Sequence, residues 1–388
     1  MKQFYLTLTS LMLLGATALP MFAQVSNNNE DGVNRVDPQN QRDVFVPGQV
    51  LVKFKDESGI QVSRNSTGRF RAASNNEVNN LLFEYGVNDM EKLFPNEVAK
   101  PQFQLRRRVA PNGAIVQEKN LDKVFWLKTN IESPDSTLQL IEQLKKLPEV
   151  EYAEPNYYMY ITETAPTSVR HRAPQVTMTT TTEAETTATY ICPNPGQNPL
   201  YGEQYGIPQQ NIHQLWNKNI INKKRPVIAI IDTGVDITHP DLANNIWTNS
   251  KEIEGENGYD DDRNGYNDDI NGWNFVDGNN NVVDLNRHGT HCAGIAAAVD
   301  NELGIVGANP LARIMPVRVM DENGRGSAAT IARGIVYAAE NGADILSLSL
   351  GGPTLAQAQK EALDFAYQSA IIVAAAGNSG MSIYKQYT

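Results

Sequence analysis

Residues 225–232 read RPVIAIID, an apolar run without a polar break that ends in Asp232. Similar runs follow at residues 312–320, 343–350 and 370–377. Continuous apolar strands that alternate with helices are typical of a parallel sheet covered by helices on both faces. The sequence therefore predicts an α/β fold with its active site at the carboxyl ends of the strands. The helices are expected between the strands, at residues 291–299, 330–342 and 355–369.

The segment upstream of this fold has a different pattern. Strand-like runs occupy residues 48–54 (GQVLVKF), 121–129 and 150–160, and apolar residues have helical spacing at 75–87 and 133–150. Two helices over a few antiparallel strands predict a small α+β domain that precedes the α/β domain.

The composition excludes some classes of partner. The chain has 388 residues, of which 33 are basic and 44 acidic, and its net charge is −11. This length suits two or three domains. The acidic surplus argues against nucleic acid and anionic membrane surfaces as partners.

The N-terminus has the pattern of a signal peptide. Lys2 precedes a short apolar run, and small residues follow up to Ala23. We expect residues 1–23 to be removed after Ala23 and the protein to be exported, to the extracellular space, the periplasm or the cell surface. The apolar run is too short to span a membrane, and no later segment approaches that length.

A linker is predicted between the two domains. Residues 161–190 are rich in threonine and contain almost no large apolar residue, so they cannot bury a core. Because proteolytic cutting concentrates in exposed chain, we interpret them as a processing linker, with a short glycosylated stalk as the alternative. The remaining boundaries are a disordered lead-in at 24–46, the α+β domain at 47–160 and the α/β domain at 191–388.

The chain has two cysteines, Cys192 and Cys292. An oxidising compartment would allow them to form a disulfide. Cys292 lies in a run of small apolar residues, where a free thiol packs as a small hydrophobe. A buried free thiol is the preferred interpretation, and the disulfide stays open.

Three polar residues end or begin predicted elements: Asp232 before Thr-Gly, His288 in RHGTHCAG, and Asn378 in AAAGNSG. Each alone is also compatible with a turn, a helix cap or a hydrogen-bonded core residue. A zinc protease of the H-E-x-x-H type is excluded, because Gly-Thr separates His288 from His291. His291 is therefore expected to be a helix residue and not a ligand.

In their order along the chain, IIDTGVDITHPDL, RHGTHCAG, SLSLGG and VAAAGNSG resemble the subtilisin-like serine proteases, from about Tyr205 to Gly380. The resemblance implies that His288 is the general base and that Asp232 orients it. It also implies that the side-chain amide of Asn378 stabilises the oxyanion. The upstream domain resembles the propeptide of this family, which implies a folding aid and an intramolecular inhibitor.

The resemblance also implies where a peptide or protein substrate binds. Two segments would flank an extended peptide and pair with its backbone, as in strand addition. They are Gly324, Arg325 and Gly326, and Ser349, Leu350 and Gly351. Glycine at such positions allows close approach of a substrate backbone. Ordinary surface loops are the alternative.

The densest acidic segment, residues 259–275, suggests a structural calcium site. Oxygen ligands alternate as in the first part of an EF-hand loop, although position twelve is Asn271 and not glutamate. The candidate ligands are Asp260, Asp262, Asn264, the carbonyl of Tyr266, and Asp268. A solvated acidic turn is the alternative.

The family resemblance implies a second calcium site. Its ligands would be the side chains of Asp241 and Asn301 and the carbonyls of Val299, Leu303 and Ile305, with Asn198 as a further candidate.

The nucleophile of the family lies in a Gly-Thr-Ser-x-Ala motif, which does not occur in these 388 residues. Ser347, Ser349, Ser379 and Ser382 lie in other segments of the resemblance. We expect a precursor that stops before the serine-bearing segment and is inactive as given. A catalytically dead relative that binds peptides or proteins is the alternative. A calcium-binding structural module would explain only residues 259–275.

Overall fold

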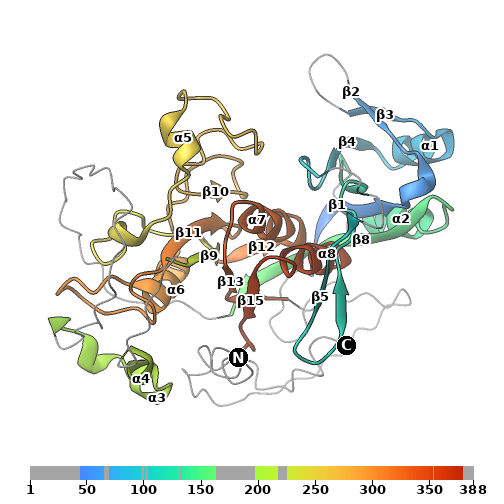
Figure 1. Ribbon diagram of the computed structural model, residues 1–388. Coiled ribbons are helices and arrows are strands. Elements are labelled where there is room, and N and C mark those ends of the chain that lie inside the picture. Colours follow the sequence, from blue (N-terminus) through green and yellow to red (C-terminus); the bar gives the residue numbers. More distant parts are fainter. Residues whose placement is uncertain are drawn as a thin grey trace.

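The computed structural model describes residues 44–64, 70–97, 100, 104–131, 133–162, 197–216, 225–352 and 354–378. Figure 1 shows two bodies of structure, one drawn in blue to green and the other in yellow to red. The predicted signal peptide, most of the lead-in, the linker beyond Thr162, and Cys192 lie outside the described residues.

The first sheet is antiparallel and centres on β1 (Phe45–Phe54). This strand pairs with β7 (Val124–Thr129) on one side and β8 (Val150–Ile161) on the other, and β4 (Val87–Lys92) pairs with β7. Helices α1 (Asn76–Glu84) and α2 (Pro134–Leu144) begin at the caps Asn75 and Ser133, whose side chains accept backbone N–H bonds. Strands β1, β7 and β8 and both helices confirm the elements predicted for the α+β segment, whereas β4 was not predicted.

Alternate residues of β1 belong to different cores because successive side chains of a strand point to opposite faces. Val50, Val52 and Phe54 pack with residues of α1 and α2. Leu51 belongs to the large core that also contains residues of the second body. The first sheet is therefore packed between its own helices and the second body.

Two short hairpins complete this region and have no counterpart in the sequence predictions. One joins β2 (Val62–Arg64) to β3 (Phe70–Ala73), and the other joins β5 (Arg107–Val109) to β6 (Ile115–Gln117). Strands of three or four residues with charged positions carry little apolar periodicity, so pattern alone does not detect them.

The second sheet confirms the predicted parallel α/β arrangement. Its order is β10 (Trp273–Asn274), β11 (Arg313–Arg318), β9 (Val227–Asp232), β13 (Ile345–Leu348) and β15 (Ile371–Ala374), and every pair is parallel. Helix α6 (His288–Ala297) packs on one face with Ile228 and Ile230. Helix α7 (Ala328–Glu340) packs on the other face, in the core that includes Ala229 and Ile231.

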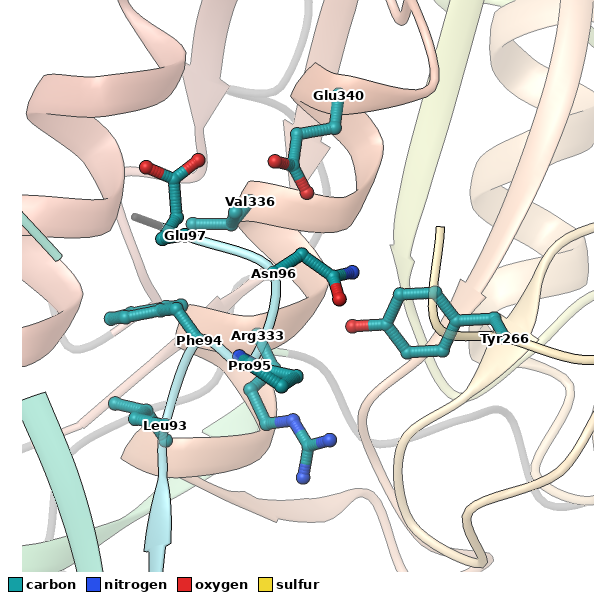
Figure 2. A pocket seen from close by; sticks show the side chains of 9 residues that line it. All are labelled: Leu93, Phe94, Pro95, Asn96, Glu97, Tyr266, Arg333, Val336 and Glu340. Atoms are coloured by element: carbon teal, nitrogen blue, oxygen red, sulfur yellow. The ribbon is translucent and has the colours of Figure 1, made fainter. Parts of the chain in front are cut away.

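Helices α7 and α8 (Gln357–Ala366) lie between the two sheets (Figure 1). The segment 93–97 of the first body covers α7, and a pocket remains between them (Figure 2). Glu97 from this segment and Glu340 from α7 both line the pocket.

The remaining elements are short. They are the 3-10 turns at Asp56–Ser58, Tyr201–Glu203 and Ala243–Asn245, helices α3 (Gly206–Gln209), α4 (Ile212–Trp216) and α5 (Ser250–Glu254), and strands β12 (Arg325–Ser327) and β14 (Leu350–Gly351). Among the residues that the structure describes, no helix is long and apolar enough to cross a membrane.

Candidate active site

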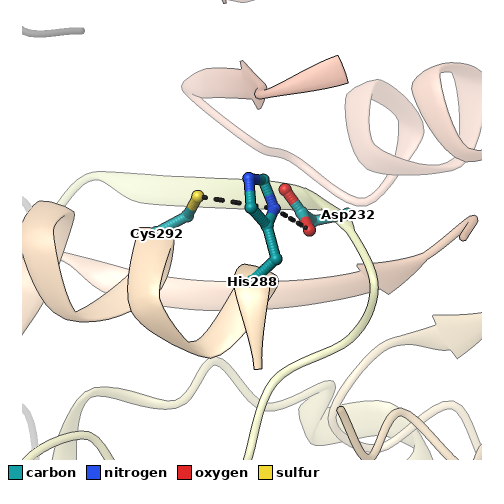
Figure 3. Close-up of side chains that lie close together, drawn as sticks. All are labelled: Asp232, His288 and Cys292. Carbon is teal, nitrogen blue, oxygen red and sulfur yellow. Dashed lines mark hydrogen bonds and ion pairs between the residues drawn. The ribbon is translucent and has the colours of Figure 1, made fainter. Parts of the chain in front are cut away.

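Asp232 and His288 form a buried pair at the carboxyl end of the second sheet. Asp232 is the last residue of β9 and His288 the first of α6, and their side chains are 1% and 6% exposed. Oδ1 of Asp232 lies 2.7 Å from Nδ1 of His288 (Figure 3). Because Nδ1 faces the carboxylate, Nε2 is the ring nitrogen left for a reacting group.

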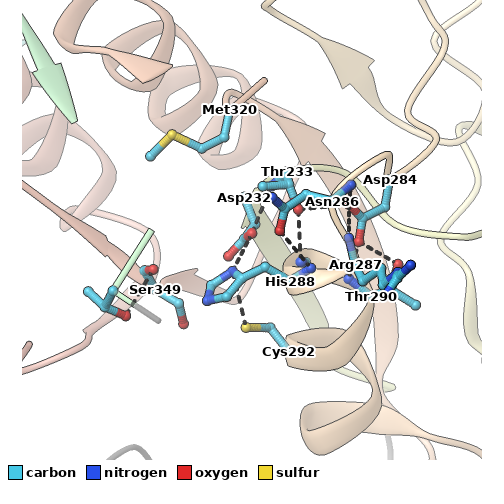
Figure 4. Close-up of polar contacts among 12 residues, drawn as sticks. Asp232, Thr233, Asp284, Asn286, Arg287, His288, Thr290, Cys292, Met320 and Ser349 are labelled. Carbon is cyan, nitrogen blue, oxygen red and sulfur yellow. Dashed lines mark hydrogen bonds and ion pairs between the residues drawn. The ribbon is translucent and has the colours of Figure 1, made fainter. Parts of the chain in front are cut away.

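Asp284 fixes the backbone around this pair (Figure 4). Its Oδ1 accepts a hydrogen bond from the Thr233 hydroxyl at 2.8 Å, and its Oδ2 accepts one from the Thr290 hydroxyl at 2.7 Å. The Thr233 oxygen in turn accepts the backbone N–H of Gly289 at 2.9 Å. Asp284 is not among the site residues predicted from sequence. Its only local sign is a carboxylate four residues before the histidine of RHGTHCAG.

Close packing also sets the start of α6. A Cβ atom on Gly289 would lie 2.1 Å from the carbonyl oxygen of Gly234. Only glycine allows the helix to begin this close to the turn that follows β9.

The charge of Asp232 favours the protonated imidazole of His288. Burial lowers the pKa of His288, but the hydrogen bond with Asp232, the one with Cys292 and the charge of Asp232 raise it above its ordinary value overall. This is the electrostatic arrangement that a general base needs when it takes up a proton.

The other two motif residues of α6 have different environments. Cys292 is half-buried and forms no disulfide within the described residues, which do not include Cys192; its Sγ lies 3.9 Å from Nδ1 of His288. Burial raises the pKa of this thiol, so the neutral, weakly nucleophilic form is favoured. His291 is exposed on α6, as expected for a helix residue.

The two predicted substrate segments lie on either side of an extended strand, and that strand is β8 of the same chain. Arg325 and Gly326 in β12 pair antiparallel with Tyr160 and Met159. On the opposite edge, Leu350 in β14 pairs with Ile161. Ile161 was predicted to be the first residue of the linker. That assignment was wrong, because strands distant in sequence supply the partners that hold Ile161 in β8.

Asn378 follows β15, at the same end of the sheet as Asp232. Its side-chain amide donates a hydrogen bond to the carbonyl oxygen of Thr162, the residue after β8. Ser349, which is buried, accepts the backbone N–H of Thr162 at 3.1 Å through its carbonyl oxygen. The structure thus brings Asn378 and both substrate segments to one stretch of extended chain.

Asp241 lies against the loop 299–305. Its Oδ2 accepts the backbone N–H of Ile305 at 3.0 Å, its carbonyl accepts the N–H of Val299, and Asn301 donates to the carbonyl of Pro240. The buried Oδ1 of Asp241 has no hydrogen-bond partner among the described residues, and burial raises the pKa of this carboxyl.

Asn198 is bonded to the same loop and also has an unsatisfied oxygen. Its Nδ2 donates to Asp300 at 2.6 Å, and its Oδ1 is buried without a partner among the described residues. Buried oxygens without donors are the environment that a hard cation such as Ca²⁺ satisfies. Together with the carbonyls of Leu303 and Ile305, the residues present fit such an ion.

The acidic loop folds around internal hydrogen bonds. Oδ1 and Oδ2 of Asp260 accept the backbone N–H groups of Asn264 and Gly265, and Asp262 also accepts that of Asn264. Asp268 instead turns both carboxylate oxygens to the N–H of Gly258.

A second set of carboxylates gathers nearby. One carboxylate oxygen from each of Glu252, Asp262 and Asp269 lies within 4.8 Å of the other two. The Tyr266 ring is buried in the core. Of the predicted calcium ligands in this loop, Asp260, Asp262 and Asn264 lie together, whereas the Asp268 carboxylate faces the backbone N–H of Gly258.

Comparisons with known proteins agree with this geometry. Residues 223–388 match the subtilase family, peptidase S8. The thermophilic serine proteinase of Bacillus sp. (strain AK1) is 29% identical over 380 residues, which cover 96% of this chain and 70% of the relative. Thermitase of Thermoactinomyces vulgaris is 40% identical over 179 residues, which cover 46% of this chain and 55% of thermitase.

A solved structure is similar across both bodies. Fervidolysin from Fervidobacterium pennivorans, a keratinolytic enzyme related to subtilisin, superposes with a TM-score of 0.52 at 22% identity. The match covers 86% of this chain and 40% of the fervidolysin chain. This similarity shows the subtilisin-like fold, and the chain spans about half the length of thermitase and less of fervidolysin.

Proposed function

Because residues 223–388 match the subtilase family and hold the buried Asp232–His288 pair at the carboxyl end of the parallel sheet, we propose that the protein is the precursor of an exported serine endopeptidase. The observation that supports this most is the strand β8, which lies between β12 and β14 as a substrate would. Signal-peptide removal after Ala23 is part of the proposal.

In the proposed reaction, Nε2 of His288 accepts the proton of a serine hydroxyl as the serine oxygen adds to the substrate carbonyl carbon. Asp232 holds the ring and stabilises the imidazolium, and Asn378 donates to the oxyanion. His288 then gives the proton to the leaving amine, and water hydrolyses the ester. The serine is the one of the family's Gly-Thr-Ser-x-Ala motif, which is not among these 388 residues.

Residues 44–162 are proposed to inhibit the enzyme until they are removed. Strand β8 of this segment pairs with both β12 and β14. A substrate peptide therefore cannot pair with these two strands while β8 is bound there. Calcium is proposed as a structural ion at Asp241, supported by the unsatisfied oxygens of Asp241 and Asn198, and at the loop of Asp260 and Asp262.

A fluorophosphonate probe tests the proposed chemistry, because it labels only an activated serine. We expect the product of the complete gene to be labelled once β8 has been released. His288→Ala should abolish labelling, and His291→Ala, an exposed histidine on the same helix, should retain it.

The 388-residue polypeptide should not be labelled. Labelling of this polypeptide that is lost in His288→Ala would reveal a nucleophile among these residues and contradict the expectation. A complete gene product that is never labelled would favour the non-catalytic alternative, a relative that binds peptides or proteins.

A further inference from the structure

We propose that the hairpin formed by β5 and β6 is a second attachment site of the first body, which keeps that body bound to α8 after β8 has left β12 and β14. The inference rests on the proposed function, because it names the contact that sets how long the inhibitory segment stays bound. The hairpin reaches the C-terminal end of α8 (Figure 1) and contacts residues 367–370 there.

Arg108 of β5 supplies a cation that the end of α8 lacks. Helix α8 has no basic residue in its own last turn. Nη1 of Arg108 donates to the carbonyl oxygen of Tyr367 at 2.8 Å and to that of Ala370 at 3.2 Å. The guanidinium also lies over the Tyr367 ring, 4.9 Å from the ring centre. Because the carbonyls at the C-terminal end of a helix lack intrahelical donors and carry partial negative charge, a guanidinium held there stabilises α8.

Glu118, directly after β6, holds the base of the hairpin against α8. Its buried carboxylate accepts hydrogen bonds from Nζ of Lys100 and from Nε and the backbone N–H of Arg106, each at 2.9 Å. Burial raises the pKa of Glu118, but the hydrogen bonds from Arg106 and Lys100 outweigh burial and lower this pKa to about 2. The two cations lie over the ring of Phe365 in α8, 5.3 and 5.4 Å from its centre. The ionised Glu118 therefore fixes both cations beside the helix.

The hairpin and β8 hold opposite ends of α8. Nε2 of Gln368, after the helix, donates to the carbonyl oxygen of Val116 in β6 at 3.2 Å. At the N-terminal end, Glu154 of β8 accepts the backbone N–H groups of Gln357 and Ala358. The ten residues of α8 span about 15 Å, so the two attachments share no residue and can be released separately.

A hairpin that stays bound delays the loss of inhibition. While it holds the first body, β8 remains close to β12 and β14, and its return is an intramolecular step with a high effective concentration. A substrate must compete with that return. Weakening the hairpin contact alone should therefore hasten the appearance of activity.

The test refolds the product of the complete gene and measures the lag between folding, followed by circular dichroism, and full hydrolysis of a peptide substrate. Arg108→Met removes both hydrogen bonds and the charge and should shorten this lag by about tenfold or more. Arg107→Met is the matched control, because Arg107 is exposed on the same strand, and it should keep the lag. In size-exclusion chromatography, the first body should separate from the enzyme earlier in Arg108→Met than in Arg107→Met.

Tyr367→Leu tests the same contact from the second body, without a change in the first. It should also shorten the lag, and in combination with Arg108→Met the effect should be smaller than the product of the two single effects. If Arg108→Met does not fold, an unchanged lag in Tyr367→Leu overturns the proposal.

A folded Arg108→Met protein that fluorophosphonate labels and that keeps the original lag would overturn the second attachment and leave the serine protease function standing. A complete gene product that is folded but never labelled would overturn the proposed function, and this inference with it.

Discussion

Nζ of Lys53 in β1 lies 2.9 Å from Oε1 of Glu361 in α8, and these side chains are only 4% and 1% exposed. The ion pair joins the first sheet to a helix of the second body in a region that excludes water. The Tyr152 hydroxyl donates to the other carboxylate oxygen of Glu361 at 3.4 Å. Because an unpaired charge in such a place is costly, the pair favours docking of the sheet in one position.

Lys53→Met should therefore destabilise the 388-residue chain by about 3–5 kcal/mol, since it leaves the Glu361 charge buried without its partner. The double variant Lys53→Met, Glu361→Met should recover most of this loss, because apolar packing replaces both charges. Urea unfolding measures both effects. Lys145→Met is the control: Lys145 pairs with Glu142 at the surface and should change stability by less than about 1 kcal/mol. A double variant as unstable as Lys53→Met would show that the loss does not come from the unpaired charge of Glu361.

The stability of the chain with its first sheet packed against α8 should also depend on pH, through Glu154. Its carboxylate accepts the backbone N–H groups of Gln357 and Ala358 at the start of α8, at 2.8 and 2.9 Å. Burial raises the pKa of Glu154 to about 7, and the charge of Glu361 adds to this, while the N–H groups and Lys145 oppose it. A pKa that is higher in the folded chain means that the unfolded chain loses its proton first. Stability is therefore present below the unfolded pKa and falls as pH rises through about 7.

The raised pKa of Glu154 should lower the free energy of unfolding by up to about 3 kcal/mol as the pH rises from the unfolded pKa of Glu154 to 7. Glu154→Gln should remove that part of the slope, measured by urea unfolding across this range. Glu340 lines the same pocket as Glu97 (Figure 2) and should add to the slope, because burial and the neighbouring carboxyl of Glu97 raise the pKa of Glu340 to about 7. An unchanged slope in Glu154→Gln would show that this carboxyl is ionised in the folded chain.

The parallel sheet could be predicted from local pattern, whereas the Asp232–His288 pair was implied by the resemblance that the ordered motifs carry. Each apolar strand is continuous, and each polar residue directly ends a strand or begins a helix. The position of β8 could not be predicted this way. Met159 and Tyr160 find their partners at Gly326 and Arg325, and no local signal specifies pairing between strands so far apart in sequence. The Lys53–Glu361 pair could not be predicted either, because its two residues are also far apart in sequence.

The calcium proposal predicts that Asp241 carries ion-dependent stability. Binding to the folded state alone adds about 2.7 kcal/mol at a hundredfold excess over Kd. The 388-residue chain should therefore melt at higher temperature in calcium than in chelator. Asp241→Asn should remove much of this difference, whereas Glu322→Gln, an exposed carboxylate, should keep it. Identical melting curves of the original chain in calcium and in chelator would count against both proposed sites.

Gly352 and Met159 should be coupled in docking and in substrate choice. A Cβ on Gly352 would lie 2.2 Å from Sδ of Met159 and 3.0 Å from the Tyr158 carbonyl oxygen. Gly352→Ala should therefore destabilise the docked chain by about 1–3 kcal/mol, the cost of an overpacked contact.

Met159→Ala alone should also destabilise the docked chain, by about 2–5 kcal/mol, because it leaves a cavity. In the double variant the new methyl group occupies part of that space, so the loss should be smaller than the sum. Gly351→Ala is the matched control, since nothing lies within 4 Å of a Cβ there. In the active enzyme, Gly352→Ala should shift the preference at the substrate position that Met159 occupies in β8 from methionine to alanine, measured with a peptide series. Strictly additive losses, or an unchanged preference, would show that Gly352 does not shape this part of the cleft.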